Sequence, residues 1–208
     1  MDADLKNSIK TGTTILGIVC KDGVVMAADR RVTAGQSLIV SKTYKKVYPL
    51  NDYLIFAGCG SATEAQKVSK LLTAELKLTE LKSKTRPSVK QAANLLSNIQ
   101  VAASAFILGG IDEDGTASLY EITGGFLEKI EDYTASMGSG MPYVLGLLER
   151  QYKKGISTSE GIELAIESLK SSTQRDTASG NGIDVFTITS KGIKKVVSQE
   201  IQPSFKED

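Results

Sequence analysis

The chain has 208 residues, of which 41% are hydrophobic and 24% are charged, a composition typical of an ordinary globular protein. Lys and Arg number 25 against 24 Asp and Glu, so the net charge of +1 gives no reason to expect binding to nucleic acid or to a membrane. The sequence contains no histidine, which excludes Ser-His-Asp triads, Cys-His dyads and zinc sites built on histidine.

The first twelve residues are mostly polar and lack the apolar stretch of a secretory signal. We interpret them as a short propeptide or a frayed terminus, followed by one domain over residues 13–208. An apolar run begins abruptly after Gly12 and predicts a strand from Thr14 to Cys20. A second apolar strand, Val24 to Ala28, ends at three charged residues.

The rest of the chain alternates between groups of strands and pairs of helices. We expect a loop over residues 34–37, and we expect the glycines at 58 and 60 to interrupt a strand. Ser61, with Glu64 three residues later, predicts a capping box. In chain order, the further predicted elements are strands 46–49 and 53–57, helices 61–84 and 88–103, strands 106–111, 117–123 and 126–130, helices 142–153 and 157–174, and strands 183–189 and 194–197.

This order argues against a parallel sheet whose strands are joined by single crossover helices. It favours an α+β domain in which helix pairs cover a sheet or a pair of sheets. No apolar run reaches the roughly 18 residues that a membrane-spanning helix needs. Cys20 and Cys59 both lie in apolar runs, so we expect buried free thiols, with a bridge between them as the alternative.

Without histidine, an enzyme needs another proton acceptor that works near neutral pH. A free α-amino group has an unperturbed pKa of about 7.7–8.0 and fits that need. A threonine at a new N-terminus carries a hydroxyl nucleophile and an amine base in one residue. We therefore hypothesise that the chain is cut between Gly12 and Thr13 and that Thr13 is the nucleophile. The alternative is that Thr13 merely begins a β-strand.

A terminal threonine needs groups that orient its amine and tune its pKa. Candidates follow the apolar strands and the glycine-flanked bends: Asp29, Lys45 or Lys46, Ser139, Asp176 and Ser179. Each also has a purely structural interpretation. Asp29 can pair with Arg30 or Arg31, Lys46 can be a surface lysine, and the segments around the other three can be an ordinary turn and a glycine-capped helix end.

Seven short segments, in this order along the chain, resemble the proteasome β-subunit family, and most closely the archaeal 20S type. They are TGTT at 11–14, GVVMAADRRVTAG at 23–35, KKV at 45–47, AG at 57–58, GGID at 109–112, GSG at 138–140 and QRDTASG at 174–180. The resemblance implies the N-terminal nucleophile hydrolase fold, a four-layer αββα sandwich. It also implies autocatalytic removal of residues 1–12 and assembly into stacked seven-membered β rings capped by α rings.

The resemblance also assigns roles to individual residues. Thr13 matches the nucleophile, Asp29 and Lys46 its acidic and lysine partners, and the Gly58 amide the oxyanion donor. The polar cluster around the amine matches Ser139, Asp176 and Ser179. The residues expected to contact substrate are Thr33, through its backbone, and Val32, Tyr44 and Phe56, in a pocket for a hydrophobic residue before the cut.

Three segments depart from the family pattern. The loop over residues 36–42 is about one residue longer than usual, so the choice of Lys46 rests on the match to KKV. Residues 50–56 are about two residues short, and several residues are missing between Asn98 and Phe106. The last departure bears on how neighbouring subunits pack.

The leading hypothesis is a threonine endopeptidase of the cytoplasm that hydrolyses unfolded polypeptides and needs no cofactor or metal. Its expected partners are α subunits, other β subunits and, through the α ring, a regulatory ATPase; nucleic acid and membrane are not expected. The first alternative is a mainly structural β subunit that needs a partner β subunit for processing. The second is a different N-terminal-nucleophile amidohydrolase that acts on a small amide.

Overall fold

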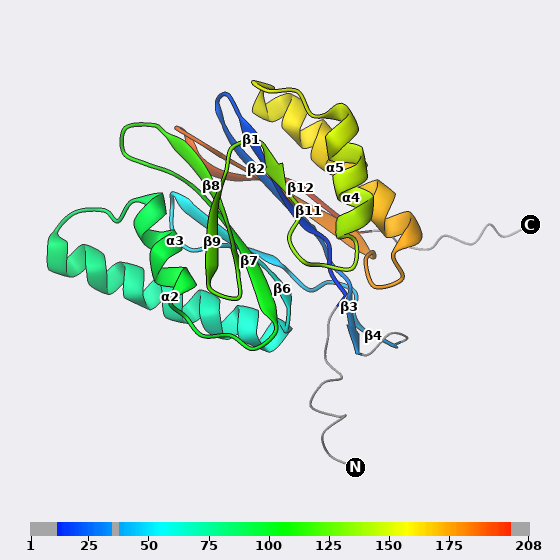
Figure 1. Cartoon of the computed structure of the whole chain (residues 1–208), viewed down its shortest axis with the longest axis horizontal. Helices are drawn as coiled ribbons and strands as arrows, with labels where there is room; N and C mark the ends of the chain where they lie inside the picture. Colours follow the sequence, from blue (N-terminus) through cyan, green and yellow to red (C-terminus); the bar gives the residue numbers. More distant parts are fainter. Residues whose placement is uncertain (1–11, 35–37, 201–208) are drawn as a thin grey trace, which may run out of the picture.

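Two antiparallel five-stranded sheets face each other in the computed structural model, which describes residues 12–34 and 38–200 (Figure 1). In the first sheet, from edge to edge, the strands are β10 (Tyr133–Thr134), β1 (Ile15–Cys20), β2 (Gly23–Asp29), β11 (Gly182–Thr189) and β12 (Gly192–Glu200). In the second they are β5 (Val47–Pro49), β6 (Leu54–Gly60), β7 (Ser104–Ile111), β8 (Ala117–Thr123) and β9 (Phe126–Ile130).

A helix pair covers the outer face of each sheet. Helices α4 (Met141–Gln151) and α5 (Thr158–Arg175) pack on the first sheet, and α2 (Ala62–Ser83) and α3 (Val89–Ser97) pack on the second (Figure 1). A separate hairpin is formed by β3 (Val32–Ala34) and β4 (Leu38–Ser41). The α+β class and the αββα layering are confirmed.

Three hydrophobic cores fill the spaces between the four layers. Because side chains of a strand alternate between its faces, β2 sends Val24 and Met26 into the core between the sheets and Val25 and Ala27 toward α4 and α5. All seven residues of β2 are buried. Burial on both faces explains why the strand is an uninterrupted apolar run in the sequence.

Several predicted boundaries are wrong, and tertiary contacts explain them. Strand β6 continues through Gly60 because residues 58–60 pair with the start of β7. Helix α3 ends at Ser97, six residues before the predicted end, and the chain then turns into β7. The hairpin β3–β4 and the short β10 form where no strand was predicted. The expected loop at 34–37 lies mostly outside the described residues, as does the predicted propeptide before Gly12.

The capping box at α2 is only half formed. The Ser61 side chain accepts a hydrogen bond from the Glu64 amide at 3.3 Å. The Glu64 carboxylate instead accepts from the Ala102 amide at 2.9 Å and from the Ser104 hydroxyl at 2.6 Å. Glu64, which was expected to cap the start of α2, therefore connects this helix to the segment that enters β7.

The two cysteines are free and buried, as predicted. Cys20 lies in the core beneath α4 and α5, whereas Cys59 lies in the core between the sheets. The alternative of a bridge between them is therefore wrong. Among the described residues, no helix is both long enough and apolar enough to cross a membrane.

Candidate active site

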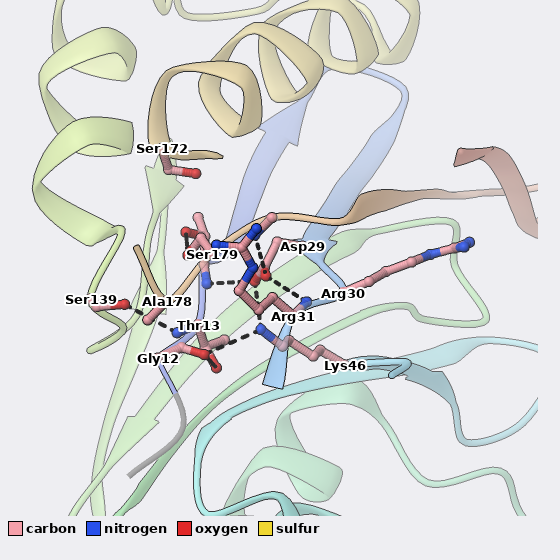
Figure 2. A network of polar contacts seen from close by, with 12 residues as sticks. Gly12, Thr13, Asp29, Arg30, Arg31, Lys46, Ser139, Ser172, Ala178 and Ser179 are labelled. Atoms are coloured by element: carbon pink, nitrogen blue, oxygen red, sulfur yellow. Dashed lines mark hydrogen bonds and ion pairs between the residues drawn. The ribbon is translucent and has the colours of Figure 1, made fainter. Parts of the chain in front are cut away.

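Thr13 lies at the start of β1, at the end of the first sheet where the loops that follow α5 and precede α4 meet (Figure 2). Its exposed fraction is 1%. The chain packs tightly there: a Cβ atom on Gly138 would lie 2.0 Å from the Thr13 carbonyl oxygen, and one on Gly140 would lie 1.8 Å from Thr14 Oγ1. The two glycines around Ser139 are required for this close approach.

The Thr13 nitrogen begins a chain of hydrogen bonds. It donates to Ser139 Oγ at 3.2 Å, and the Ser139 hydroxyl donates to Asp176 Oδ2 at 2.6 Å. The Ser179 hydroxyl donates to the same carboxylate oxygen at 2.5 Å. Because that uses the only proton of Ser179, the Thr14 hydroxyl is the donor in its 2.7 Å contact with Ser179. The cluster predicted around the amine is therefore assembled.

Asp176 reaches this position because α5 ends there. It is the C-cap of the helix, with an extended backbone (φ −84°, ψ 114°), so its side chain turns away from the helix axis. Its second oxygen, Oδ1, accepts from the Ala178 amide at 3.1 Å. The bend places Ser179, three residues later, beside the same carboxylate.

A second polar group, Asp29 with Lys46, lies on the other side of Thr13 (Figure 2). Lys46 Nζ is 2.6 Å from Asp29 Oδ1, and both side chains are at most 2% exposed. Asp29 also accepts three backbone amides, from Thr14 at 2.8 Å, Arg31 at 2.9 Å and Gly180 at 3.0 Å. Lys46 is therefore not a surface lysine, and Asp29 holds it in place.

Burial determines the protonation of Lys46. Removing its ammonium from water lowers the pKa of Lys46, and the negative charge of Asp29 only partly opposes this effect. A lysine whose pKa is lowered in this way holds its proton less tightly than an exposed lysine.

The carbonyl of Gly12 lies between these groups. Thr13 Oγ1 donates to this carbonyl oxygen at 2.7 Å, and Lys46 Nζ approaches it at 3.4 Å. A Cβ atom on residue 12 would lie 1.7 Å from Ala178 Cβ, so only glycine fits before Thr13. The hydroxyl and the buried lysine thus both contact the carbonyl of the bond between residues 12 and 13.

A narrow pocket beside Thr13 contains several of the residues expected to contact substrate. Val32, Tyr44 and Gly58 line it together with Thr13 and Lys46. The Gly58 amide donates to the Lys46 carbonyl at a long 3.3 Å, so an oxyanion would have to share or replace this bond. Its role as oxyanion donor stays a prediction.

The structure places the other two predicted substrate residues, Thr33 and Phe56, in different surroundings. Thr33 lies beside the predicted processing site, where its side-chain Oγ1 accepts a hydrogen bond from the Gly12 amide at 3.3 Å. Phe56 is completely buried in the core beneath α2 and α3, where its ring lies 5.0 Å from that of Phe106. It does not line the pocket, so its assignment needs correction: it supports the strand that carries Gly58.

The family model described as "Proteasome subunit" matches residues 9–188. The chain belongs to the proteasome subunit family. It is 37% identical to a proteasome subunit beta of Archaeoglobus profundus, over 97% of this chain and 95% of that protein. It is 39% identical to a proteasome subunit beta of Methanohalophilus mahii (91% and 92%) and to a proteasome subunit beta 1 of Thermococcus onnurineus (94% and 97%).

These relatives mark the chain as a β-type, 20S core member of the proteasome family. β subunits of the family are generally threonine peptidases, and its members assemble with other subunits into the proteasome complex. Among the described residues, no group of three or more His, Cys, Asp or Glu side chains could hold a metal ion.

Sequence reasoning missed one contributor to this proteasome-family site, Arg31. Its guanidinium donates to the Thr177 carbonyl and to Asn181 Oδ1, each at 2.7 Å, and so holds the loop that carries Asp176. Asp29 accepts only the backbone amide of Arg31, while Arg30 pairs with Asp184 at 2.7 Å. The alternative that Asp29 pairs with either arginine side chain is therefore wrong. The only indication of this role in the sequence was the pair of arginines that follows a buried strand.

Proposed function

We propose that this chain is the catalytic β subunit of an archaeal-type 20S proteasome and that Thr13, once residues 1–12 are removed, is its nucleophile. The observation that carries the proposal is the position of Thr13. Its nitrogen is bonded to the Ser139–Asp176 pair, and its hydroxyl donates to the Gly12 carbonyl beside Lys46. This arrangement supports both processing of the chain and cleavage of peptides.

Processing begins when Thr13 Oγ1 attacks the carbonyl carbon of Gly12. The bond from that carbon to the Thr13 nitrogen breaks, the hydroxyl proton passes to the departing nitrogen, and an ester forms on Oγ1. Water then hydrolyses the ester and releases residues 1–12 as a carboxylic acid. Lys46, 3.4 Å from the carbonyl oxygen, polarises the bond that is attacked.

Peptide cleavage uses the amine that processing frees. The amine accepts the proton of Oγ1, and the oxygen attacks the substrate carbonyl carbon. The bond from that carbon to nitrogen breaks, the proton passes to the leaving amine, and water then hydrolyses the ester left on Thr13 to release a carboxylic acid. Ser139, held by Asp176, orients the amine, and Asp29 holds Lys46 beside the carbonyl position that Gly12 occupies before processing. The Gly58 amide stabilises the oxyanion, and Val32 and Tyr44 favour a hydrophobic residue before the cut.

The same proposal covers assembly and location. The chain forms seven-membered β rings stacked between α rings in the cytoplasm, and a regulatory ATPase delivers unfolded polypeptides through the α ring. The backbone beside Thr33 adds the substrate as an extra strand, which reads a peptide irrespective of its sequence.

Substitution of Thr13 tests the proposal. Thr13→Ala removes the hydroxyl, so we expect peptide cleavage by the assembled protein to fall at least about 1,000-fold and residues 1–12 to stay attached. Thr13→Ser is the matched control because it keeps a hydroxyl at the same position, and it should still process and cleave. Cleavage by Thr13→Ala at the wild-type rate refutes the proposal.

The second candidate function is a mainly structural ring subunit that depends on a partner β subunit. The narrowness of the pocket beside Val32 and Tyr44 favours it, since this pocket holds only about 10 Å³ of free space. Assembly of the chain with α subunits alone separates the two functions. Loss of residues 1–12 in that assembly supports the catalytic subunit, and their retention supports the partner-dependent one.

A further inference from the structure

A large cavity opens beside Gly12 and Ser139, and it adjoins the narrow pocket at Gly60. Its volume is about 730 Å³, against about 10 Å³ for the pocket beside Val32 and Tyr44. Its walls come from the end of β6, the segment over residues 101–105, the end of β8 and the loops that carry Ser139 and Asp176. Pockets that bind small ligands have volumes of roughly 300–1,000 Å³, so this cavity has room for one or more side chains of a peptide.

The cavity lies on the side of Thr13 from which a leaving group departs. When a peptide bond is cut, the amine of the departing segment takes a proton from the Thr13 nitrogen, so that segment must lie near this nitrogen. The nitrogen is bonded to Ser139, which lines the cavity. Lys46, which lines the narrow pocket, lies on the other side of Thr13 from Ser139 (Figure 2).

The lining of the cavity is largely apolar. Val101, Ala102, Ala103, Ala105 and Met137 form much of it, and Met137 is 65% exposed at its edge. Among the described residues of the wall, the one charged side chain is Asp176, which already accepts hydrogen bonds from Ser139, Ser179 and the Ala178 amide. Such a wall favours an apolar side chain over a charged one, because a charge would lose water without gaining a partner.

The shape of the wall follows from the short segment after α3. Over residues 98–103 the chain runs from α3 to β7, and the Glu64 carboxylate accepts hydrogen bonds from the Ala102 and Ala103 amides. The segment therefore runs directly into β7 and leaves space beside Thr13. The hydrogen bonds from Ala102 and Ala103 to Glu64 keep the segment in this position.

We propose that this cavity, here called the post-cut cavity, binds a large apolar side chain of the residues that follow the scissile bond and so selects where peptides are cut. The inference rests on the proposed function. It assigns selectivity to the residues after the cut as well as to the residue before it.

Peptides that differ only after the cut test the inference. The assembled wild-type protein is given internally quenched peptides with one fixed sequence before the scissile bond and Gly, Asp, Leu or Phe directly after it. We expect kcat/KM to be about 10-fold or more higher for Leu and Phe than for Gly, and lowest for Asp, because an apolar pocket discriminates by about 10- to 200-fold.

A variant that fills the post-cut cavity tests whether the preference for Leu over Gly depends on this cavity. Ala103 is exposed on the cavity wall, and Ala103→Trp should reduce the Leu-to-Gly ratio to near 1 while residues 1–12 are still removed. Thr116→Trp is the matched control, because it adds the same ring on an exposed turn at the other end of β7 and should keep the ratio. If Ala103→Trp fails to fold, Met137→Ser, which removes apolar surface at an exposed edge, should lower the ratio instead.

The outcomes separate this inference from the proposed function. The inference is overturned if a processed, active wild-type protein cuts the Gly and Leu peptides equally. It is also overturned if the filling variant keeps the preference for Leu. Either result leaves the proposed function intact. A wild-type assembly that neither loses residues 1–12 nor cuts any peptide overturns the proposed function and the inference together.

Discussion

The buried pair of Asp29 and Lys46 is the residue-scale feature that distinguishes this site from an ordinary strand end. A carboxylate that accepts three backbone amides and a lysine is fixed in position before any substrate arrives. Pairing also stabilises two charges that would otherwise be costly to bury. Under the proposed function, the same two side chains serve both catalysis and folding.

Lys46→Met should lower both the stability of the fold and the rate of peptide cleavage. It leaves the buried Asp29 carboxylate without its cation, so we expect a loss of about 3–5 kcal/mol in the free energy of unfolding together with loss of peptide cleavage. The double variant Asp29→Asn with Lys46→Met removes the unpaired charge and should recover part of the stability but none of the activity. Urea unfolding and a peptide assay measure both effects.

The neighbouring lysine provides the control. Lys45 is exposed, whereas Lys46 is buried, so Lys45→Met should change stability by less than about 0.5 kcal/mol and leave cleavage unchanged. Equal effects of the two substitutions would contradict the assignment of Lys46.

At the scale of elements, a second buried ion pair holds the first sheet together. Arg30, directly after β2, donates two hydrogen bonds to Asp184 on β11, at 2.7 and 3.0 Å, and Lys195 on β12 lies 3.0 Å from the same carboxyl group. Burial alone would raise the pKa of Asp184, but the hydrogen bonds from Arg30 and Lys195 outweigh it and hold that pKa below its ordinary value.

This lowered pKa makes the stability of the sheet sensitive to acid. The contribution of Asp184 is present above its unfolded-state pKa, about 3.9, and is lost as the pH falls through its lower folded-state pKa. Thermal melts between pH 7 and pH 3 should therefore show a smaller acid-induced drop in Tm for Asp184→Asn than for the wild type. Glu167→Gln, on an exposed pair with Lys170, should keep the wild-type drop. An unchanged drop in Asp184→Asn would contradict the argument.

The order and type of most elements follow from sequence periodicity, and the αββα layering follows from the family resemblance. Boundaries were missed where distant segments decide them. Gly60 is in a strand because β7 pairs with it, and Glu64 bonds the segment that enters β7 instead of capping α2. The structure brings Asp29, Lys46, Ser139, Asp176 and Ser179 together around Thr13 but places Phe56 in a core, and their catalytic roles stay predictions. The loop-holding role of Arg31 was not foreseen, because it depends on a backbone carbonyl that is 146 positions away.

At the scale of the whole molecule, the two cysteines report on the integrity of two separate cores. Burial raises the pKa of Cys20 to about 12 and that of Cys59 to about 11. The thiolate is the reactive form, so both cysteines should resist alkylation in the folded protein. Mass spectrometry after iodoacetamide at pH 8 should show no label in the native state and two labels in guanidinium chloride. Rapid labelling of the native protein would contradict the packing described.

The central claim is that Thr13 becomes the N-terminus and supplies its own proton acceptor. The intact mass of the assembled wild-type subunit tests it most directly. The account predicts the mass of residues 13–208, with Thr13 as the first residue in N-terminal sequencing. A fully assembled, peptide-cleaving particle whose subunit still carries residues 1–12 would contradict it.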